Sequence, residues 1–300
     1  MAGTSRNVRV LVTGANGFVG SHIVSLLLSR GYVVNATVRR QTASEKLIAT
    51  FACDRLHVFV IPDLTSEQAL DEAIRGCKYV VHVASTVPSK EQASGIDIDS
   101  AISSIESVMN SAVAHASEKV VLTSSMSTHL DVKAPILNES TWYTPDRSST
   151  KLMVQYMSSK TLVERRAWEL SSTLKLPLTT VAPVYIGGPT IIHEQDPKSS
   201  VSNQDLLRCI EDESRSRIPG WIDVRTVAHL HLHAIEDHSL NGRRILACTH
   251  NRGVVPMDCS LMNSLLAKDS AALIDFDRTK RDLLEQIDAF NSGQTRRVVA

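Results

Sequence analysis

The sequence predicts an α/β protein with a doubly wound parallel sheet, followed by a smaller C-terminal lobe. Two observations support this prediction. Strand-like and helix-like segments alternate through the first 180 residues, and such alternation is typical of parallel strands covered by helices on both faces. The first strand also runs directly into a glycine-rich turn and an apolar helical segment, which is how doubly wound folds begin.

The first strand, the glycine turn and the first helix predict a Rossmann dinucleotide site. Residues 8–13 form a short, β-branched, apolar strand, and residues 23–28 form an apolar helical run. Between them, Gly14 permits a tight turn, Gly17 lets the backbone approach a pyrophosphate, and Gly20 lets the helix pack closely on the strand. The helix N-terminus would face the phosphates. The alternative is that these glycines serve only the turn.

The second strand, over residues 32–38, ends in Arg39 and Arg40. At this point an acidic residue would bind the adenosine 2′-hydroxyl, whereas arginine can neutralise a 2′-phosphate and stack on the adenine. The sequence therefore favours NADP(H) over NAD(H), with Lys46 adding positive charge from the next helix. The alternative is a pair of solvated arginines at a strand end.

The later elements follow the same alternation. Strands are expected over residues 57–61, 79–83, 119–123 and 178–181, and helices over residues 66–74, 98–115 and 150–172. Beyond residue 183 the pattern loosens and glycine and proline separate shorter elements. We expect residues 1–183 to form the NADP-binding Rossmann domain with the catalytic residues, and residues 184–300 to form mainly a substrate-binding lobe. Segments around residues 221–250, including a strand over residues 243–248, are expected to return to the Rossmann domain.

Composition excludes several classes of function. The 300 residues are 43% hydrophobic and carry zero net charge, so nothing indicates a nucleic-acid partner or an anionic membrane surface. The five cysteines have no metal-ligand spacing, and we expect reduced thiols and no metal. His229, His231 and His233 share one helical segment, but we expect a structural role for them. Residues 1–7 are short and polar, and no stretch reaches the roughly 20 apolar residues of a membrane span. We expect a cytoplasmic monomer or homodimer.

Tyr156 and Lys160 are the main catalytic candidates. On a helix they lie one turn apart on the same face, where the lysine ammonium could lower the pKa of the phenol. A free tyrosine loses its proton only near pH ~10, so a tyrosine that exchanges a proton at neutral pH needs such a neighbour. Taken alone, the spacing is also compatible with a tyrosine packed against a lysine stem.

These motifs together resemble the extended short-chain dehydrogenase/reductases, in particular the branch of dihydroflavonol, aldehyde and methylglyoxal reductases. The resemblance covers roughly residues 8–236. It rests on the glycine loop TGANGFVG, Arg39, the pair Asp63-Leu64, the runs VHVAS at 81–85 and LTSS at 122–125, the Tyr156 and Lys160 spacing, and APVYIGGP at 182–189.

The resemblance implies a catalytic role for three residues. Ser125 matches the serine that donates to the substrate carbonyl, Tyr156 matches the general acid, and Lys160 matches the lysine that holds the nicotinamide ribose. Ser124 is the close rival for the serine role. The sequence departs from the family at Ser103 and Glu106, where many relatives carry glycine and asparagine, so the family's catalytic asparagine has no assigned counterpart here.

The resemblance also implies the contacts of the cofactor. Backbone amides of Phe18 and Val19 would bind the pyrophosphate. The remaining contacts would come from Asp63 and Leu64 at the adenine, Ala84 and Ser85 at the ribose and phosphates, and Pro183 and Ile186 at the nicotinamide. Asp63 has a competing explanation as a residue beside a helix N-cap.

The implied activity is NADPH-dependent reduction of a ketone or aldehyde to an alcohol. We expect the substrate to meet Met126, His129, Tyr185 and Trp221, which favours an apolar or aromatic carbonyl compound over a nucleotide sugar. Two alternatives remain open at this point. One is an NAD-dependent nucleotide-sugar epimerase or dehydratase, and the other is a non-catalytic, NADP-sensing regulatory protein.

Overall fold

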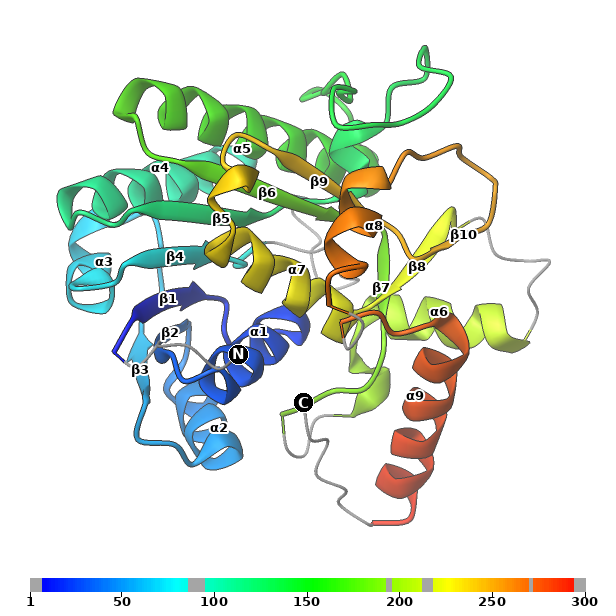
Figure 1. The fold of residues 1–300 in the computed structure, drawn as a ribbon, viewed down its shortest axis with the longest axis horizontal. Coiled ribbons are helices and arrows are strands. Elements are labelled where there is room, and N and C mark those ends of the chain that lie inside the picture. Colours follow the sequence, from blue (N-terminus) through cyan, green and yellow to red (C-terminus); the bar gives the residue numbers. More distant parts are fainter. Residues whose placement is uncertain (1–6, 86–94, 193–195, 212–217, 270–271, 294–300) are drawn as a thin grey trace.

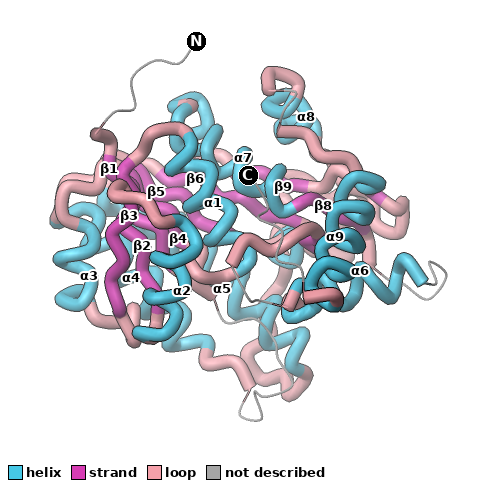
Figure 2. Tube along the Cα trace, turned by 90° about the horizontal axis from the view of Figure 1, so that it is seen from below, coloured by secondary structure: helices cyan, strands magenta, loops and turns pink. Residues whose placement is uncertain are grey.

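The computed structural model describes residues 7–85, 95–192, 196–211, 218–269 and 272–293. Its centre is a seven-stranded parallel sheet in the order β3-β2-β1-β4-β5-β6-β9. Figure 2 shows these strands enclosed by helices. The strands are β1 (Arg9–Thr13), β2 (Val33–Val38), β3 (Leu56–Val60), β4 (Tyr79–His82), β5 (Lys119–Thr123), β6 (Leu178–Pro183) and β9 (Arg244–Ala247). The predicted fold class is confirmed.

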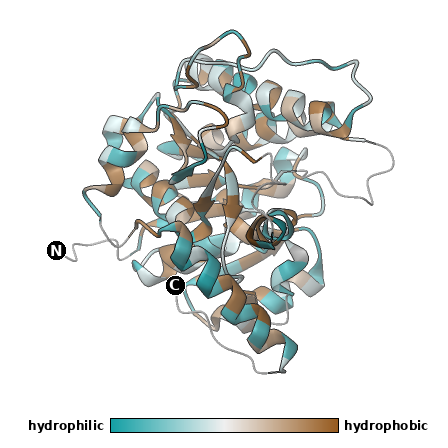
Figure 3. Cartoon of the chain, turned by 90° about the vertical axis from the view of Figure 1, so that its right-hand side faces the viewer, coloured by the Kyte–Doolittle hydropathy of each residue, from teal (hydrophilic) through white to brown (hydrophobic). Residues whose placement is uncertain are grey.

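Each face of the sheet carries its own hydrophobic core. One core joins the sheet to α1 (Phe18–Ser29), α2 (Gln41–Phe51) and α7 (Val224–Glu236). The other joins it to α3 (Glu67–Ile74), α4 (Ile98–Ala114) and α5 (Leu152–Leu174). The strands are apolar on both faces because both faces are covered, and the interior is accordingly the most hydrophobic part of the chain (Figure 3).

Local sequence accounts for several element boundaries. Ser66 accepts a hydrogen bond from the Ala69 amide at the start of α3, and Asp97 does the same for Ser100 at the start of α4. Such side-chain caps satisfy amides that have no partner inside the helix. At the other end of α5, Lys175 adopts a left-handed conformation, with φ at 54°, which stops the helix.

A smaller lobe is built around a second sheet, in the order β10-β8-β7. Its strands are β7 (Tyr185–Gly187), β8 (Gly220–Asp223) and β10 (His250–Asn251), and its helices are α6 (Val201–Glu211) and α9 (Phe276–Asn291). Helix α8 (Ser260–Leu266) packs against β9 and α7 of the body instead. The strand predicted near residues 243–248 is β9, which pairs with β6 at the edge of the large sheet. The chain therefore crosses between the two parts of the molecule (Figure 1). The division at residue 183 stays a prediction.

Three short 3-10 helices complete the described elements, η1 (Met126–His129), η2 (Pro197–Ser199) and η4 (His238–Leu240). The first of them directly follows β5 and belongs to the site described below. Within the described part of the chain, no helix has both the length and the apolar character that crossing a bilayer requires.

Candidate active site

The glycine turn leaves the start of α1 open to a ligand. Gly14 has a φ of 65°, and a Cβ atom on Gly20 would lie 2.2 Å from the Gly14 carbonyl oxygen, so a side chain at either position would disrupt the turn. Gly17 is the N-cap of α1 and no side chain caps this helix end. The first amides of a helix have no partner within the helix, so those of Phe18 and Val19 could bind phosphate oxygens.

A cavity of about 260 Å³ lies along the carboxyl ends of the strands. Among the residues predicted to contact a cofactor, it is lined by Arg39, Asp63, Leu64, Ala84, Ser85 and Lys160. Ligands of open parallel sheets bind at this edge. Lys46, in contrast, is exposed on α2, while Pro183 ends β6 and Ile186 lies in β7; these three do not line the cavity.

Asp63 has a local structural role as well as a place in the cavity wall. Its carboxylate accepts hydrogen bonds from the Thr65 amide at 2.9 Å and from the Thr65 hydroxyl at 2.8 Å. These bonds are the main reason why the pKa of Asp63 lies below its usual value, and Arg39 lowers it further. The structure therefore shows the local contacts of Asp63 near the start of α3, whereas its contact with the adenine stays a prediction.

Three predicted catalytic residues meet at the carboxyl end of β5. Ser125 follows this strand and begins η1, where its hydroxyl also accepts from the Ser127 amide at 3.2 Å. Its hydroxyl lies close enough to the phenol of Tyr156 on α5 to lower the pKa of that phenol. One turn further along α5, the Lys160 ammonium donates to the Thr123 carbonyl oxygen at 3.1 Å. The geometry therefore groups a serine, a tyrosine and a lysine, and of these three Lys160 lines the cavity.

The pKa of Tyr156 does not follow the direction that its spacing to Lys160 predicted. Burial raises the pKa of the Tyr156 phenol above its ordinary value, and the hydrogen bond with Ser125 opposes this effect. The raised pKa contradicts the predicted lowering by Lys160, whose ammonium donates to the Thr123 carbonyl oxygen instead. Burial also lowers the pKa of Lys160, to about 8, against the opposing effect of Glu164.

The two candidate serines have different partners. Ser124 is 4% exposed, and its hydroxyl donates to the carboxylate of Glu164. Ser125 is more exposed and contacts Tyr156. A serine that polarises a substrate carbonyl needs a hydroxyl free to turn towards the substrate, and this geometry favours Ser125.

Two residues of this region were not predicted from the sequence. His82 is buried at the end of β4 and lines the cavity. The sequence feature that could have revealed it is a polar residue at the end of an otherwise apolar strand. Glu164 is completely buried on α5; its signal was the spacing of four residues from Lys160, which is more commonly that of a surface ion pair. Asn110, which lies one turn after Glu106 and is a possible substitute for the asparagine of the family, donates to Glu67 at 2.8 Å.

The four residues predicted to meet the substrate do not share one environment. Tyr185 is partly buried, and its phenol lies close enough to raise the pKa of Tyr156. Met126, His129 and Trp221 are 6%, 0% and 1% exposed and pack within the protein. Trp221 stands between Tyr185 and Phe276, with ring centroids at 5.7 and 6.3 Å. A role in substrate binding stays a prediction for all four.

The histidine segment of α7 has two separate structural roles. His231 accepts a hydrogen bond from the Thr123 hydroxyl at 2.7 Å, since its Nδ1 donates to the Val227 carbonyl. His229 and His233 both face the carboxylate of Asp269, at 3.2 and 3.8 Å, a partner that local spacing did not reveal. Among the described residues, no group of three side chains is arranged to hold a metal ion.

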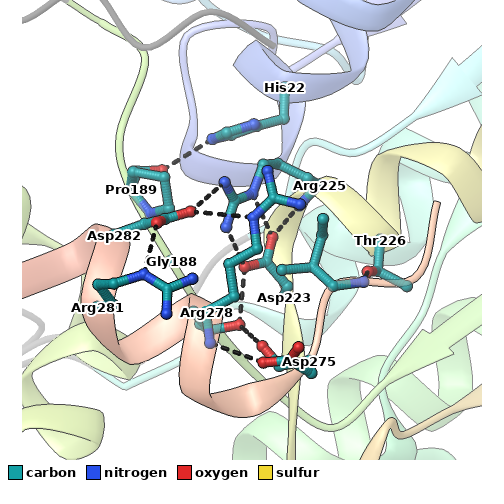
Figure 4. Close-up of polar contacts among 12 residues, drawn as sticks. His22, Gly188, Pro189, Asp223, Arg225, Thr226, Asp275, Arg278, Arg281 and Asp282 are labelled. Atoms are coloured by element: carbon teal, nitrogen blue, oxygen red, sulfur yellow. Dashed lines mark hydrogen bonds and ion pairs between the residues drawn. The ribbon is translucent and has the colours of Figure 1, made fainter. Parts of the chain in front are cut away.

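An ion network joins α9 to the end of β8 and the start of α7 (Figure 4). Arg225 forms ion pairs with Asp223 at 2.7 Å and with Asp282 at 2.6 Å. Above this network, His22 of α1 is bonded to the Pro189 carbonyl at 2.9 Å. Thr226 accepts from the Ile274 amide and donates to the Ala272 carbonyl. These contacts connect the glycine-loop helix with the smaller lobe.

Comparison with known proteins points in the same direction as the geometry. Residues 10–247 match the family described as NAD dependent epimerase/dehydratase. The chain is 32% identical over 250 residues to a cinnamoyl-CoA reductase of Medicago truncatula, covering 79% of this chain and 75% of the relative. It is 30% identical over 262 residues to the NADPH-dependent methylglyoxal reductase of Saccharomyces cerevisiae, covering 79% and 77%.

Solved structures give the same picture at the level of the fold. The crystal structure of yeast methylglyoxal/isovaleraldehyde reductase complexed with NADPH superposes with a TM-score of 0.81 at 25% identity, covering 95% of this chain and 99% of that one. Vestitone reductase from alfalfa superposes with a TM-score of 0.76 at 22% identity, covering 95% and 99%; at this identity the likeness concerns the fold alone.

Proposed function

The chain belongs to the NAD dependent epimerase/dehydratase family, the extended short-chain dehydrogenase/reductases, and from this we propose that it is an NADPH-dependent carbonyl reductase. The observation that carries the proposal is the grouping of Ser125 and Tyr156 with Lys160, which lines the cavity at the carboxyl ends of the strands. The relatives named above that act as reductases support the same reaction.

The residues of the cavity fit a dinucleotide phosphate. The turn has no space for a side chain at Gly14 or Gly20, and the uncapped start of α1 offers amide donors. Arg39 lines the far part of the cavity, where its guanidinium can bind a 2′-phosphate. Lys160 would donate to ribose hydroxyls after leaving the Thr123 carbonyl. When bound, NADPH supplies the hydride.

Proton transfer and carbonyl activation are the tasks of the protein. Ser125 donates its hydroxyl hydrogen to the carbonyl oxygen and holds that oxygen beside Tyr156. Tyr156 then releases its proton to the same oxygen, a general-acid step that such a positioned group accelerates by about 10² to 10⁴. The raised pKa of Tyr156 keeps the phenol protonated at neutral pH, as a proton donor must be. The Lys160 ammonium stabilises the tyrosinate that remains.

The substrate we propose is an apolar or aromatic ketone or aldehyde. Tyr185 lies beside Tyr156 and stacks edge-on against Trp221, so an aromatic surface borders the reacting carbonyl. To test this function, purified protein is mixed with NADPH and a panel of such carbonyl compounds, and the loss of NADPH absorbance is followed. Turnover with aromatic carbonyls supports the proposal. Recovery of tightly bound NAD, with no preference for NADPH, would instead support a nucleotide-sugar epimerase.

A further inference from the structure

A buried ion pair lies directly behind the catalytic residues. Glu164 of α5 has no exposed side-chain surface, and its Oε1 atom accepts from Arg244 Nε of β9 at 2.7 Å. The carboxylate also accepts from the hydroxyl of Ser124, from Thr180 Oγ1 at 2.9 Å and from Trp168 Nε1 at 3.3 Å. Three of these donors reach Oε1 and one reaches Oε2, so the carboxylate is held from both oxygens.

Arg244 extends this network to the segment that follows the catalytic strand. Its Nη1 donates to the carbonyl oxygens of Glu139 and Thr141, at 3.0 and 2.7 Å, and its Nη2 donates to Thr128 Oγ1 at 3.2 Å. The guanidinium also stacks on the ring of Trp142, at 3.6 Å from the centroid. One ion pair therefore holds together α5, the end of β5 and the residues around 139–142.

Stability alone does not explain a charged pair at this place. Removing two charges from water costs several kcal/mol per ion, and apolar pairs of similar volume are often as stable or about 1 to 4 kcal/mol more stable. The ion pair does, however, lie next to both parts of the proposed site, the serines after β5 and the lysine of α5. Ser124 precedes Ser125, and Glu164 follows Lys160 by one helical turn on α5. Glu164 is also the group that opposes the effect of burial on the pKa of Lys160.

We propose that Glu164 is a positioning residue of the reductase site, which holds Ser124 and Ser125 against α5 and supplies the anion that balances the Lys160 ammonium. This inference rests on the proposed function. Arg244 of β9 and His129 of η1 also act electrostatically on Glu164. His82 of β4 interacts electrostatically with Lys160. Burial lowers the pKa of His129 to about 4 and that of His82 to about 3, so both are neutral near pH 7.

The decisive variant is Glu164→Gln, with Glu169→Gln as the matched control. Glu169 lies on the same helix with a side chain that is 64% exposed and paired with Arg166. The affinity for NADPH is measured by fluorescence from about pH 6 to 10, and kcat is measured in parallel. We expect the alkaline loss of affinity to begin about one pH unit lower in Glu164→Gln, because its lysine loses the nearby anion. We also expect kcat to fall about tenfold or more. Glu169→Gln should match the wild type.

A second variant separates positioning from folding. Glu164→Gln leaves Arg244 as an unpaired buried charge, which can itself unfold a protein. The double variant Glu164→Gln/Arg244→Met removes both charges, so it should fold. It should still lose its affinity for NADPH at a lower pH than the wild type, as Glu164→Gln does. If the double variant regains the wild-type pH profile and kcat, Glu164 is only the structural counter-ion of Arg244 and the inference is wrong. Affinity requires no turnover, so a protein that shifts its affinity but reduces no carbonyl compound contradicts the proposed function and not this role.

Discussion

Thr13 and His82 share a hydrogen bond of 2.8 Å between Oγ1 and Nδ1, and its direction follows from the neighbours of Thr13. The Thr13 oxygen accepts from the amides of Val83 at 3.1 Å and Ala84 at 3.2 Å. Both of its lone pairs are therefore occupied, and its own hydrogen must point at His82 Nδ1. The imidazole is neutral with the proton on Nε2, consistent with a pKa that burial lowers to about 3.

This tautomer is directly measurable. We expect nitrogen chemical shifts of His82 to report protonated Nε2 and bare Nδ1, unchanged between about pH 5 and 9, because protonation would break the bond from Thr13. In Thr13→Val, which removes the donor, the fixed tautomer should be lost. A His82 ring that titrates near its ordinary pKa in the wild-type protein would refute this assignment.

Acid should destabilise the protein through four buried histidines. Burial lowers the pKa of His22, His129 and His231 to about 4 and that of His82 to about 3. Between the ordinary histidine pKa of about 6.5 and these values, the unfolded chain binds protons that the native chain does not. The free energy of unfolding therefore falls as the pH falls, by up to roughly 1.4 kcal/mol per pH unit for each histidine.

Urea unfolding at about pH 7 and pH 5 measures this effect. His231→Gln should reduce the pH dependence of the unfolding free energy by the equivalent of one proton. Replacing His57, which is exposed, by glutamine should leave this pH dependence unchanged. A stability that stays constant over this interval would show that these histidines are accessible to protons in the native state.

Arg39 should determine which cofactor is preferred. Arg39→Asp replaces a cation on the cavity wall by an anion that repels a 2′-phosphate, so we expect NADPH affinity to fall by roughly 10- to 100-fold, the equivalent of a lost charged hydrogen bond. NADH affinity should hold or improve. Arg40→Ala is the control, since Arg40 precedes α2 and does not line the cavity. Equal affinity of the wild type for NADPH and NADH would contradict this role.

Substitutions of Ser124 and Ser125 should have different effects on kcat and on the free energy of unfolding. Ser125→Ala removes a donor at the carbonyl oxygen and should lower kcat by about 10² to 10³, with little effect on unfolding. Ser124→Ala leaves Glu164 without one of its donors, so we expect a loss of about 1 to 3 kcal/mol in unfolding free energy and a smaller change in kcat. If Ser124→Ala is the more severe kinetic variant, the serine assignment must be reversed.

The features that could be predicted from the sequence depend on short stretches of the chain. The glycine spacing, the apolar strands and the run from Tyr156 to Lys160 each lie within one or two elements. The family resemblance adds a prediction for the order of the whole sheet. The ion pair between Glu164 and Arg244 joins residues 80 positions apart, and nothing local indicates it. The same holds for Trp221, whose burial depends on packing against α6 and α9, and for the pKa of Tyr156, which depends on burial.

The most direct test of the account is the kcat of Tyr156→Phe, measured beside its affinity for NADPH. Phenylalanine keeps the ring and removes the proton, so we expect kcat to fall by at least about 100-fold while NADPH affinity stays at the wild-type value. Tyr79→Phe is the control, because Tyr79 begins β4 and so lies at the opposite edge of the sheet from the cavity. A Tyr156→Phe protein that reduces carbonyl compounds as fast as the wild type would contradict the central claim that Tyr156 is the proton donor.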